Sequence, residues 1–186
     1  MTGKDIHNDV WLAPWSPEWA REFHMEKQRI IGAMTANGHS AYVRHVGSTS
    51  IEGMAAKPII DILVYPDRSV PLEDCVPDLE RTGYKNLGEC GRPGRYFMVS
   101  GDEPGRTFYL HLCYEDHPVA LDQLLFQKIL RENESIRSRY KYTKHLLEGE
   151  FPNDRNMYRE MKGLFIAGVL EGYRQALAEN EGSDSK

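Results

Sequence analysis

A turn of small residues and a carboxylate on the strand that follows it are the features of this sequence best suited to chemistry. Gly47, Ser48, Thr49 and Ser50 come directly after a short apolar segment, and Asp61 stands inside the next one, IIDILV. A glycine followed by hydroxyls and backbone N–H groups is a natural cradle for phosphate. A carboxylate in an apolar strand is costly without a partner or a metal. The pattern indicates a phosphate site; the alternatives are a plain capped turn and a satisfied core aspartate.

Two histidines also stand on predicted strands. Alternation points His45, Asp61 and His111 sideways from three different strands. Because adjacent strands lie about 4.8 Å apart, the three side chains could converge within metal-ligand distance if their strands are neighbours in one sheet. We take all three as candidate catalytic residues. The alternative is that each bonds to nearby backbone, and that His45 braces the turn through a ring N–H.

Several basic residues could neutralise the charge of a phosphate. Lys57 precedes the strand of Asp61, and Arg92, Arg95 and Arg106 stand in or beside loops that contain Gly and Pro. The two-pronged guanidinium suits phosphate or carboxylate. Lys144 ends a stripe of three basic residues spaced at i, i+4 and i+7 on a predicted helix. We expect phosphate contacts from Lys57, Arg92, Arg106 and Lys144; the alternative for each is a solvated surface position.

Composition limits the classes of protein to consider. The chain has 186 residues, 40% hydrophobic and 27% charged, which predicts one globular domain without a membrane span. The formal charge of −5 argues against general nucleic-acid binding. Three widely spaced cysteines and the absence of a signal-peptide pattern favour a reducing cytoplasm. Composition does not indicate the oligomeric state.

The elements that must position these residues follow from hydrophobic periodicity. The pattern predicts a helix over 17–35, strands over 41–47 and 58–65, a helix over 72–82, and strands over 84–89, 95–100 and 107–115. From residue 118 the period changes to 3.6, which predicts helices broken near Asn133 and at 151–154. We therefore expect an α/β or α+β domain over 1–177, with a helical C-terminal half and a disordered acidic tail over 178–186.

The stretch RHVGSTSIEGMAAKPIIDILV resembles the signature of the GrpB-like family. The resemblance extends over nearly the whole chain, through VWLAPWSPEWAREF, RTFYLHLC, LLFQKILR and YREMKGLFI. It implies a fold of the nucleotidyltransferase superfamily, related to polymerase-β-type enzymes: a mixed sheet flanked by helices.

The resemblance also implies roles. In the superfamily a Gly-Ser turn holds the β- and γ-phosphates, and carboxylates on two strands bind two divalent ions that activate the attacking hydroxyl. Gly47-Ser48 match the turn, and Asp61 matches the first aspartate. The second acid position holds Leu63, which cannot bind a metal, and His111 stands where a third acid is expected.

The leading hypothesis is therefore an enzyme that moves a nucleotidyl group from an NTP to a small-molecule acceptor, with one ion held by Asp61 and His111. A mixed set of His and carboxylate favours a transition metal over Mg²⁺, so Mg²⁺, Mn²⁺ and Zn²⁺ all stay open. One alternative is a non-catalytic module that binds a nucleotide or another phosphorylated ligand. The other is a metal-dependent phosphoester hydrolase built on His45, Asp61 and His111.

Overall fold

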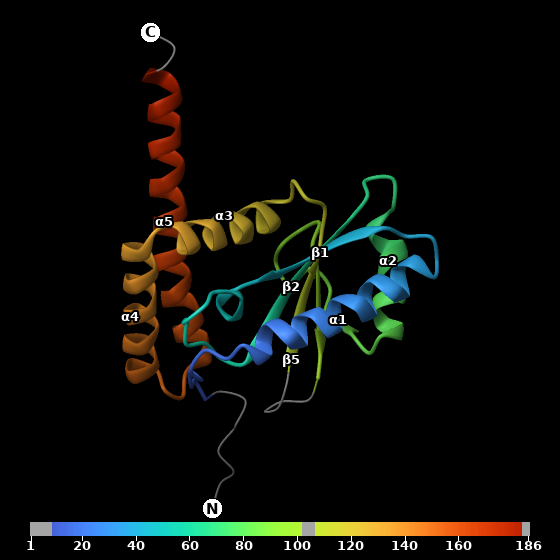
Figure 1. Ribbon diagram of the computed structural model, residues 1–186, viewed down its shortest axis with the longest axis horizontal. Helices are drawn as coiled ribbons and strands as arrows, with labels where there is room; N and C mark the ends of the chain where they lie inside the picture. Colours follow the sequence, from blue (N-terminus) through green and yellow to red (C-terminus); the bar gives the residue numbers. More distant parts are fainter. Residues whose placement is uncertain (1–8, 102–106, 184–186) are drawn as a thin grey trace, which may run out of the picture. The chain divides into compact units, whose positions relative to one another are not determined.

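In the computed structural model, which describes residues 9–101 and 107–183, five strands form one mixed sheet (Figure 1). Their order is β1-β2-β5-β4-β3. Only β2 and β5 run parallel, and the other neighbouring pairs are antiparallel. The strands are β1 (Ala41–Val46), β2 (Ile59–Pro66), β3 (Lys85–Asn86), β4 (Tyr96–Ser100) and β5 (Thr107–Leu112).

Strand β2 has a neighbour on each side and helices over both faces. Its sequence, IIDILVYP, is almost continuously apolar, as a strand covered on both faces requires. Every residue after Asp61 in this strand is buried, whereas Asp61 itself is only partly buried. The carboxylate is therefore the polar exception in an apolar strand.

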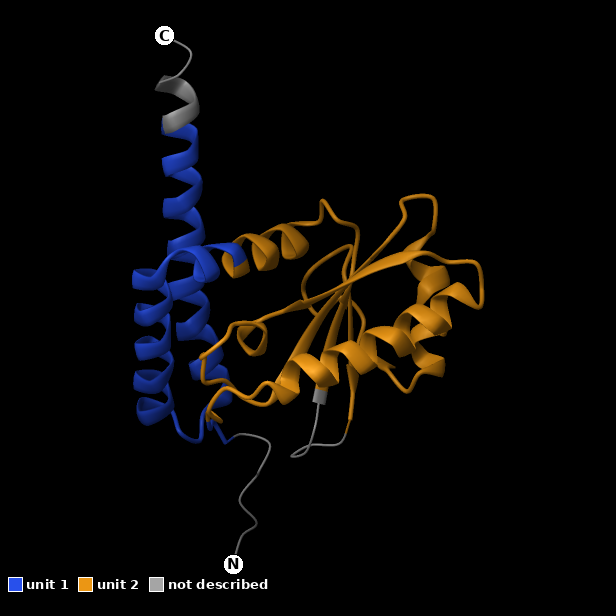
Figure 2. Ribbon diagram, viewed as in Figure 1, with its two compact units in different colours: residues 1–11, 128–186 blue, residues 12–127 orange. Residues whose placement is uncertain are grey.

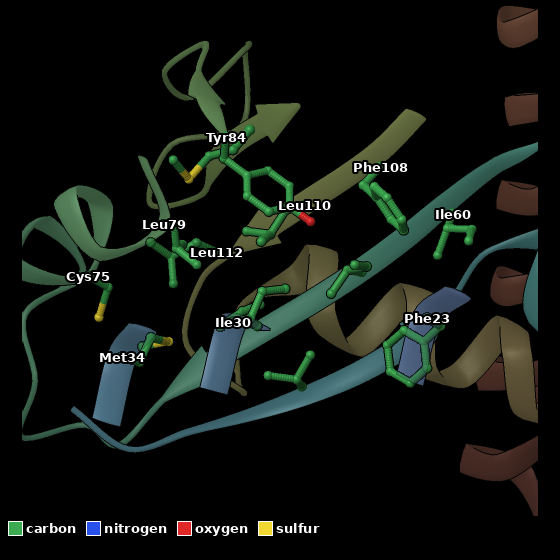
Figure 3. Packing of buried hydrophobic residues seen from close by; sticks show 14 of the residues in the cluster. Phe23, Ile30, Met34, Ile60, Cys75, Leu79, Tyr84, Phe108, Leu110 and Leu112 are labelled. Carbon is green, nitrogen blue, oxygen red and sulfur yellow. The ribbon is translucent and has the colours of Figure 1, made fainter. Parts of the chain in front are cut away.

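Helices α1 (Glu18–Thr35) and α2 (Leu72–Arg81) cover one face of the sheet (Figure 3). The chain enters α1 through Ser16, whose Oγ accepts a hydrogen bond from the N–H of Glu18 at 3.2 Å. The apolar residues that recur at helical spacing in α1 lie in the main hydrophobic core. This cluster includes Phe23, Ile30, Met34, Ile60, Cys75, Leu79, Leu110 and Leu112.

The opposite face of the sheet packs against the first part of α3 (Pro118–Glu132). This smaller cluster contains Val46, Leu63, Tyr65, Cys113 and Ala120, all at most 5% exposed. The two clusters show which way each strand residue points, and this decides which candidate side chains can meet.

The chain divides into two compact units, residues 12–127 and residues 1–11 with 128–186 (Figure 2). The first holds the sheet, α1, α2 and most of α3. The second holds α4 (Glu134–Glu150) and α5 (Arg155–Ser183), so the C-terminal half is helical as predicted. Helix α5 extends beyond residue 178, where the sequence predicts a disordered tail. No helix in the described part of the chain has the length and apolar character to cross a membrane.

Two predicted strands are shorter than expected. The strand predicted over 84–89 is reduced to Lys85–Asn86, because the side-chain oxygen of Asn86 accepts the N–H of Gly88 at 2.8 Å and turns the chain. The strand predicted over 107–115 ends at Leu112, and a turn between Tyr114 and His117 leads into α3. The break between α3 and α4 is at Asn133, as predicted, and Asn133 caps α4.

Buried Asp78 on α2 accepts hydrogen bonds from two residues just after α1 and from one residue of its own helix. It accepts from Asn37 Nδ2 at 3.0 Å, from His39 Nδ1 at 2.7 Å and from Arg81. Asp78→Ala would leave these donors without their acceptor. We expect it to lower the free energy of unfolding by roughly 1–3 kcal/mol, measured by urea denaturation. The control is Asp74→Ala, on an exposed position of the same helix, where we expect about 0.5 kcal/mol or less. Equal losses in both variants would contradict this role.

Candidate functional site

Gly47, directly after β1, lies against the side chain of Asp61 on β2. Gly47 has φ +70° and ψ −175°, a backbone conformation that is essentially restricted to glycine. A Cβ placed on Gly47 would lie 2.8 Å from Cγ and 2.9 Å from Cβ of Asp61, closer than real Cβ atoms come to other heavy atoms. The glycine is thus required for two reasons, its backbone conformation and the carboxylate packed against it. The turn and the aspartate predicted from the sequence form one structural unit.

The turn is a single 3₁₀ turn, Ser48–Ser50, held by its own hydroxyls. Ser50 Oγ donates to the carbonyl of Gly47 at 2.7 Å, and Thr49 Oγ1 donates to the carbonyl of Ile59 at 3.3 Å. Thr49 is 3% exposed. Thr49 and Ser50 therefore brace the turn from within.

Gln127 on α3 is a residue of this site that the sequence did not reveal. Its Nε2 donates to the carbonyl of His45 at 2.7 Å and to Ser50 Oγ at 2.6 Å. The side chain is buried, and it connects the turn to a helix 77 residues later in the chain. Helix α3 carries two glutamines, Gln123 and Gln127, and nothing in the sequence singles out the second.

His45 points to the opposite face of the sheet from Asp61. In the antiparallel register His45 pairs with Ile62, while Asp61 pairs with Val46. Directly paired residues share a face, so one position of offset puts His45 on the α1 side. There its ring stacks on Phe23, with centroids 4.7 Å apart, and its Nε2 lies 3.0 Å from Thr49 Oγ1.

The predicted convergence of three titratable side chains is therefore wrong for His45. Since Thr49 Oγ1 donates its proton to Ile59, it must accept from His45, so the imidazole carries its proton on Nε2. This is the position expected of a histidine that braces the turn through a ring N–H.

Leu63 occupies the position of the second acid and is fully buried. It packs with Val46, Tyr65, Cys113 and Ala120 under α3. The side chain of Leu63 is part of the apolar core on this face of the sheet. Its neighbours are apolar, so the surroundings suit a leucine and not an acid.

His111 shares the face of Asp61, because it pairs with Leu63 in the parallel register while Asp61 pairs with Tyr109. Its Nδ1 lies 3.3 Å from Nη1 of Arg95, and its ring lies beside Phe97 at 5.3 Å between centroids. Arginine can only donate, so Nδ1 must accept and the proton of the neutral ring lies on Nε2. Burial, together with the Arg95 cation, lowers the pKa of His111 to about 3.

These residues do not fit the metal site of a two-ion nucleotidyltransferase. Within 9–101 and 107–183, no group of three or more His, Cys, Asp or Glu side chains is placed to hold a metal ion. Leu63 offers no ligand atom. The lone pair of His111 Nδ1 is engaged by Arg95, and Nε2 carries the proton, so neither ring nitrogen presents a lone pair to a metal.

The other predicted cations differ in burial and in the element that carries them. Lys57 lies partly buried just before β2. Arg92 is exposed on the hairpin loop, and it is Arg95, three residues later, whose guanidinium reaches this face of the sheet. Arg106 lies outside the described residues.

Lys144 belongs to α4, in the other compact unit. It is only 1% exposed, and its Nζ stands 4.9 Å from the centre of the Tyr140 ring. Burial, with the positive charges of Lys162 and Lys141, lowers the pKa of Lys144 to about 7. Lys144 is thus a buried amine of α4, and its expected phosphate contact stays a prediction.

Comparisons of this chain with a family model, with protein sequences and with solved structures agree on one family. The family model described as GrpB protein matches residues 9–172. A UPF0157 protein of Pseudomonas aeruginosa is 35% identical over 166 residues, which are 87% of this chain and 66% of the relative. The chain thus spans slightly less than two thirds of that relative's length. The crystal structure of the conserved protein GrpB from Enterococcus faecalis matches with a TM-score of 0.69 at 28% identity, over 86% of this chain and 99% of that one.

A more distant solved structure is that of a cytoplasmic RNA terminal U-transferase. It matches with a TM-score of 0.51 at 14% identity, over 73% of this chain and 42% of that one. At this identity the likeness concerns the fold alone, and it confirms the predicted nucleotidyltransferase-like sheet with helices.

Gly47→Ala tests the contact with Asp61. The strained backbone and the displaced carboxylate should together lower the free energy of unfolding by roughly 2–4 kcal/mol. The matched control is Gly53→Ala, since Gly53 has φ +72° but nothing within 4 Å of an added Cβ. It should cost about 1–2 kcal/mol from backbone conformation alone. Urea unfolding of the two variants measures the difference, and identical losses would contradict a steric role for Asp61.

Lys144 should titrate near pH 7 instead of near its usual 10.5. Because the folded-state pKa is depressed, the unfolded chain binds more protons between about pH 7 and pH 10.5, and stability rises with pH across this window. NMR titration of the lysine side-chain signals measures the pKa. Lys162→Gln removes one repelling charge and should raise the pKa of Lys144. Lys128→Gln, a lysine paired with Glu132 at 4.0 Å, serves as the control and should leave it unchanged.

Proposed function

This chain belongs to the GrpB protein family, and we propose that it transfers a nucleotidyl group from a nucleoside triphosphate to a small-molecule acceptor. The observation that carries the proposal is the contact of Gly47 with the carboxylate of Asp61. A glycine-serine turn in contact with an aspartate on the next strand supports the assignment of a phosphate-binding turn beside a proton acceptor. The nucleotidyltransferase-like fold supports the same assignment.

The turn supplies the phosphate contacts. Thr49 and Ser50 hold its shape from within, and Gln127 holds it from α3. Preorganised donors need no rearrangement when an anion arrives, which is what makes them effective. Ser48 and the backbone of the turn would contact the β- and γ-phosphates, and Lys57 would offset part of their charge.

Asp61 then acts as the general base. The acceptor hydroxyl gives its proton to the carboxylate of Asp61 while its oxygen attacks the α-phosphorus. The bond between the α-phosphorus and the bridging oxygen breaks, and pyrophosphate leaves with that electron pair. General-base catalysis of this kind contributes typically about 10²–10⁴-fold in rate.

The acceptor is proposed to be a small molecule. The formal charge of −5 disfavours a polyanionic acceptor, since a nucleic-acid surface requires clustered positive charge.

A binding module without catalysis is the second candidate. The specific observation in its favour is Leu63, which is fully buried where the superfamily has an acid. A phosphoester hydrolase built on His45, Asp61 and His111 is not supported, because His45 faces the opposite side of the sheet.

Calorimetry against ATP, CTP, GTP and UTP, each with and without Mg²⁺, Mn²⁺ or Zn²⁺, tests binding first. We expect at least one triphosphate to bind the wild type and Ser48→Ala to weaken it about tenfold, as loss of a hydrogen bond to a charged group predicts. Asp61→Asn should keep binding within tenfold but lose pyrophosphate release by about 10²-fold or more. Asp67→Asn, at an exposed position just after β2, is the control for both measurements.

The outcomes separate the two candidates. Absence of binding by every triphosphate would remove both the enzyme and the nucleotide-binding module. Binding without any pyrophosphate release, in the presence of a pool of small hydroxyl-bearing metabolites, would favour the module.

A further inference from the structure

We infer that Arg95 and His111 form an anion-binding subsite where related enzymes have a metal-binding acid, and that His111 donates its Nε2–H to an oxygen of the ligand's phosphate. The inference deepens the proposed function by naming what the β5 side of the site recognises. It depends on that proposal only for the identity of the ligand.

The guanidinium of Arg95 is held in place from three sides. Its Nη2 donates to the carbonyl of Glu89 at 3.0 Å, its Nη1 faces Nδ1 of His111, and its Cζ stands 5.0 Å from the centre of the Phe97 ring. The residue is 6% exposed. A buried cation is costly unless an anion or hydrogen bonds compensate for it, and burial lowers the pKa of Arg95.

One hydrogen-bond donor of Arg95, its Nε–H, is not satisfied by the described residues. Within the described ranges, its Nε is buried and has no hydrogen-bond partner. Buried polar groups are nearly always bonded, so an orphan donor on a nine-tenths-buried cation calls for an explanation. An anion bound at this end of the site would supply both the missing charge and the missing acceptor, after a small adjustment of the guanidinium.

Arg95 also determines what His111 can do. Because the guanidinium only donates, it holds the imidazole in the tautomer whose proton is on Nε2. In the part of the chain that the structure describes, that Nε2 has no hydrogen-bond partner. Metal binding through Nε2 would require the proton to move to Nδ1, directly against an N–H of Arg95. Nε2 of His111 is thus a hydrogen-bond donor, and an anionic oxygen of the ligand would accept its hydrogen bond.

The charges on this face agree with that role. Leu63 and His111 are neutral at the positions where related enzymes carry acids, and Arg95 adds one positive charge. Exposed Arg44, which pairs with Leu63, adds another on the same face. Asp61 is the one carboxylate that the register places beside them on this face among the described strand residues. Some enzymes combine a neutral imidazole with a carboxylate base: the imidazole polarises the reacting group, and the carboxylate takes the proton. The ligand class is therefore a phosphate or diphosphate held through direct hydrogen bonds.

The tautomer is tested on the free full-length chain. Long-range ¹H–¹⁵N correlation NMR distinguishes protonated from unprotonated ring nitrogens, and His111→Gln assigns the signals. We expect Nε2 protonated and Nδ1 unprotonated from pH 5 to pH 8. Arg95→Met should release this preference and let the ring exchange between tautomers. A proton on Nδ1 in the wild type, or a charged ring in this pH range, would overturn the inference.

The ligand is tested with inorganic pyrophosphate in the presence of EDTA. We expect the His111 Nε2–H signal to shift on titration, while the signals of exposed His24 on α1 stay in place. His111→Gln keeps an N–H donor and should bind pyrophosphate within about threefold of the wild type. His111→Asp introduces the acid of the related enzymes and should bind at least tenfold more weakly.

With pyrophosphate as the probe, two results would contradict the subsite. One is an unshifted His111 signal at saturating pyrophosphate. The other is tighter binding by His111→Asp than by the wild type once Mg²⁺ is added, which would make this a metal-ligand position. If pyrophosphate shifts His111 but no nucleoside triphosphate binds, the subsite stands and the proposed function falls. If a triphosphate binds and reacts without shifting His111, the proposed function stands and the subsite falls.

Discussion

The approach of Gly47 to the carboxylate of Asp61 is the constraint on which the rest of the site depends. A side chain at residue 47 would occupy the space of the aspartate, and the backbone there adopts a conformation that only glycine tolerates readily. Such a position is stable only if its surroundings determine it from several directions. Thr49, Ser50 and Gln127 do this by hydrogen bonds that tie the turn to β2 and α3.

Electrostatics distinguish this site from one organised by carboxylates around two ions. The face of the sheet that carries Asp61 presents a buried leucine, a neutral imidazole and a buried arginine. Two ions placed together need several negative ligands to hold them, and the described residues do not provide such a set. The same arrangement is favourable for an anion, because Arg95 contributes positive charge and His111 a directed donor. The chemistry proposed here is therefore direct hydrogen bonding to phosphate combined with proton transfer to Asp61.

Polar groups on the two faces of the sheet serve different purposes. On the α1 side, His45 stacks on Phe23 and bonds to Thr49, so its imidazole stabilises the turn from behind. On the other side, the ring of His111 contacts Arg95, and the register places it on the same face as Asp61, the proposed general base. Two histidines with the same local pattern thus have opposite roles, one structural and one in the proposed ligand site. The difference is a single position of register between β1 and β2.

The sequence by itself determined the elements, the helical C-terminal half, and the pairing of a glycine-serine turn with Asp61. These features depend on local periodicity and on motifs within about 20 residues, which a single chain displays directly. The mixed sheet was expected from the resemblance to the GrpB-like family. Only the tertiary structure decided that His45 faces away from Asp61, because strand register is a contact between segments and one step of register reverses the face. It also decided that Arg95, and not Arg92, reaches His111, and that Gln127 holds the turn. Those contacts join residues 16 to 82 positions apart, and no local pattern specifies which distant partner a side chain will meet.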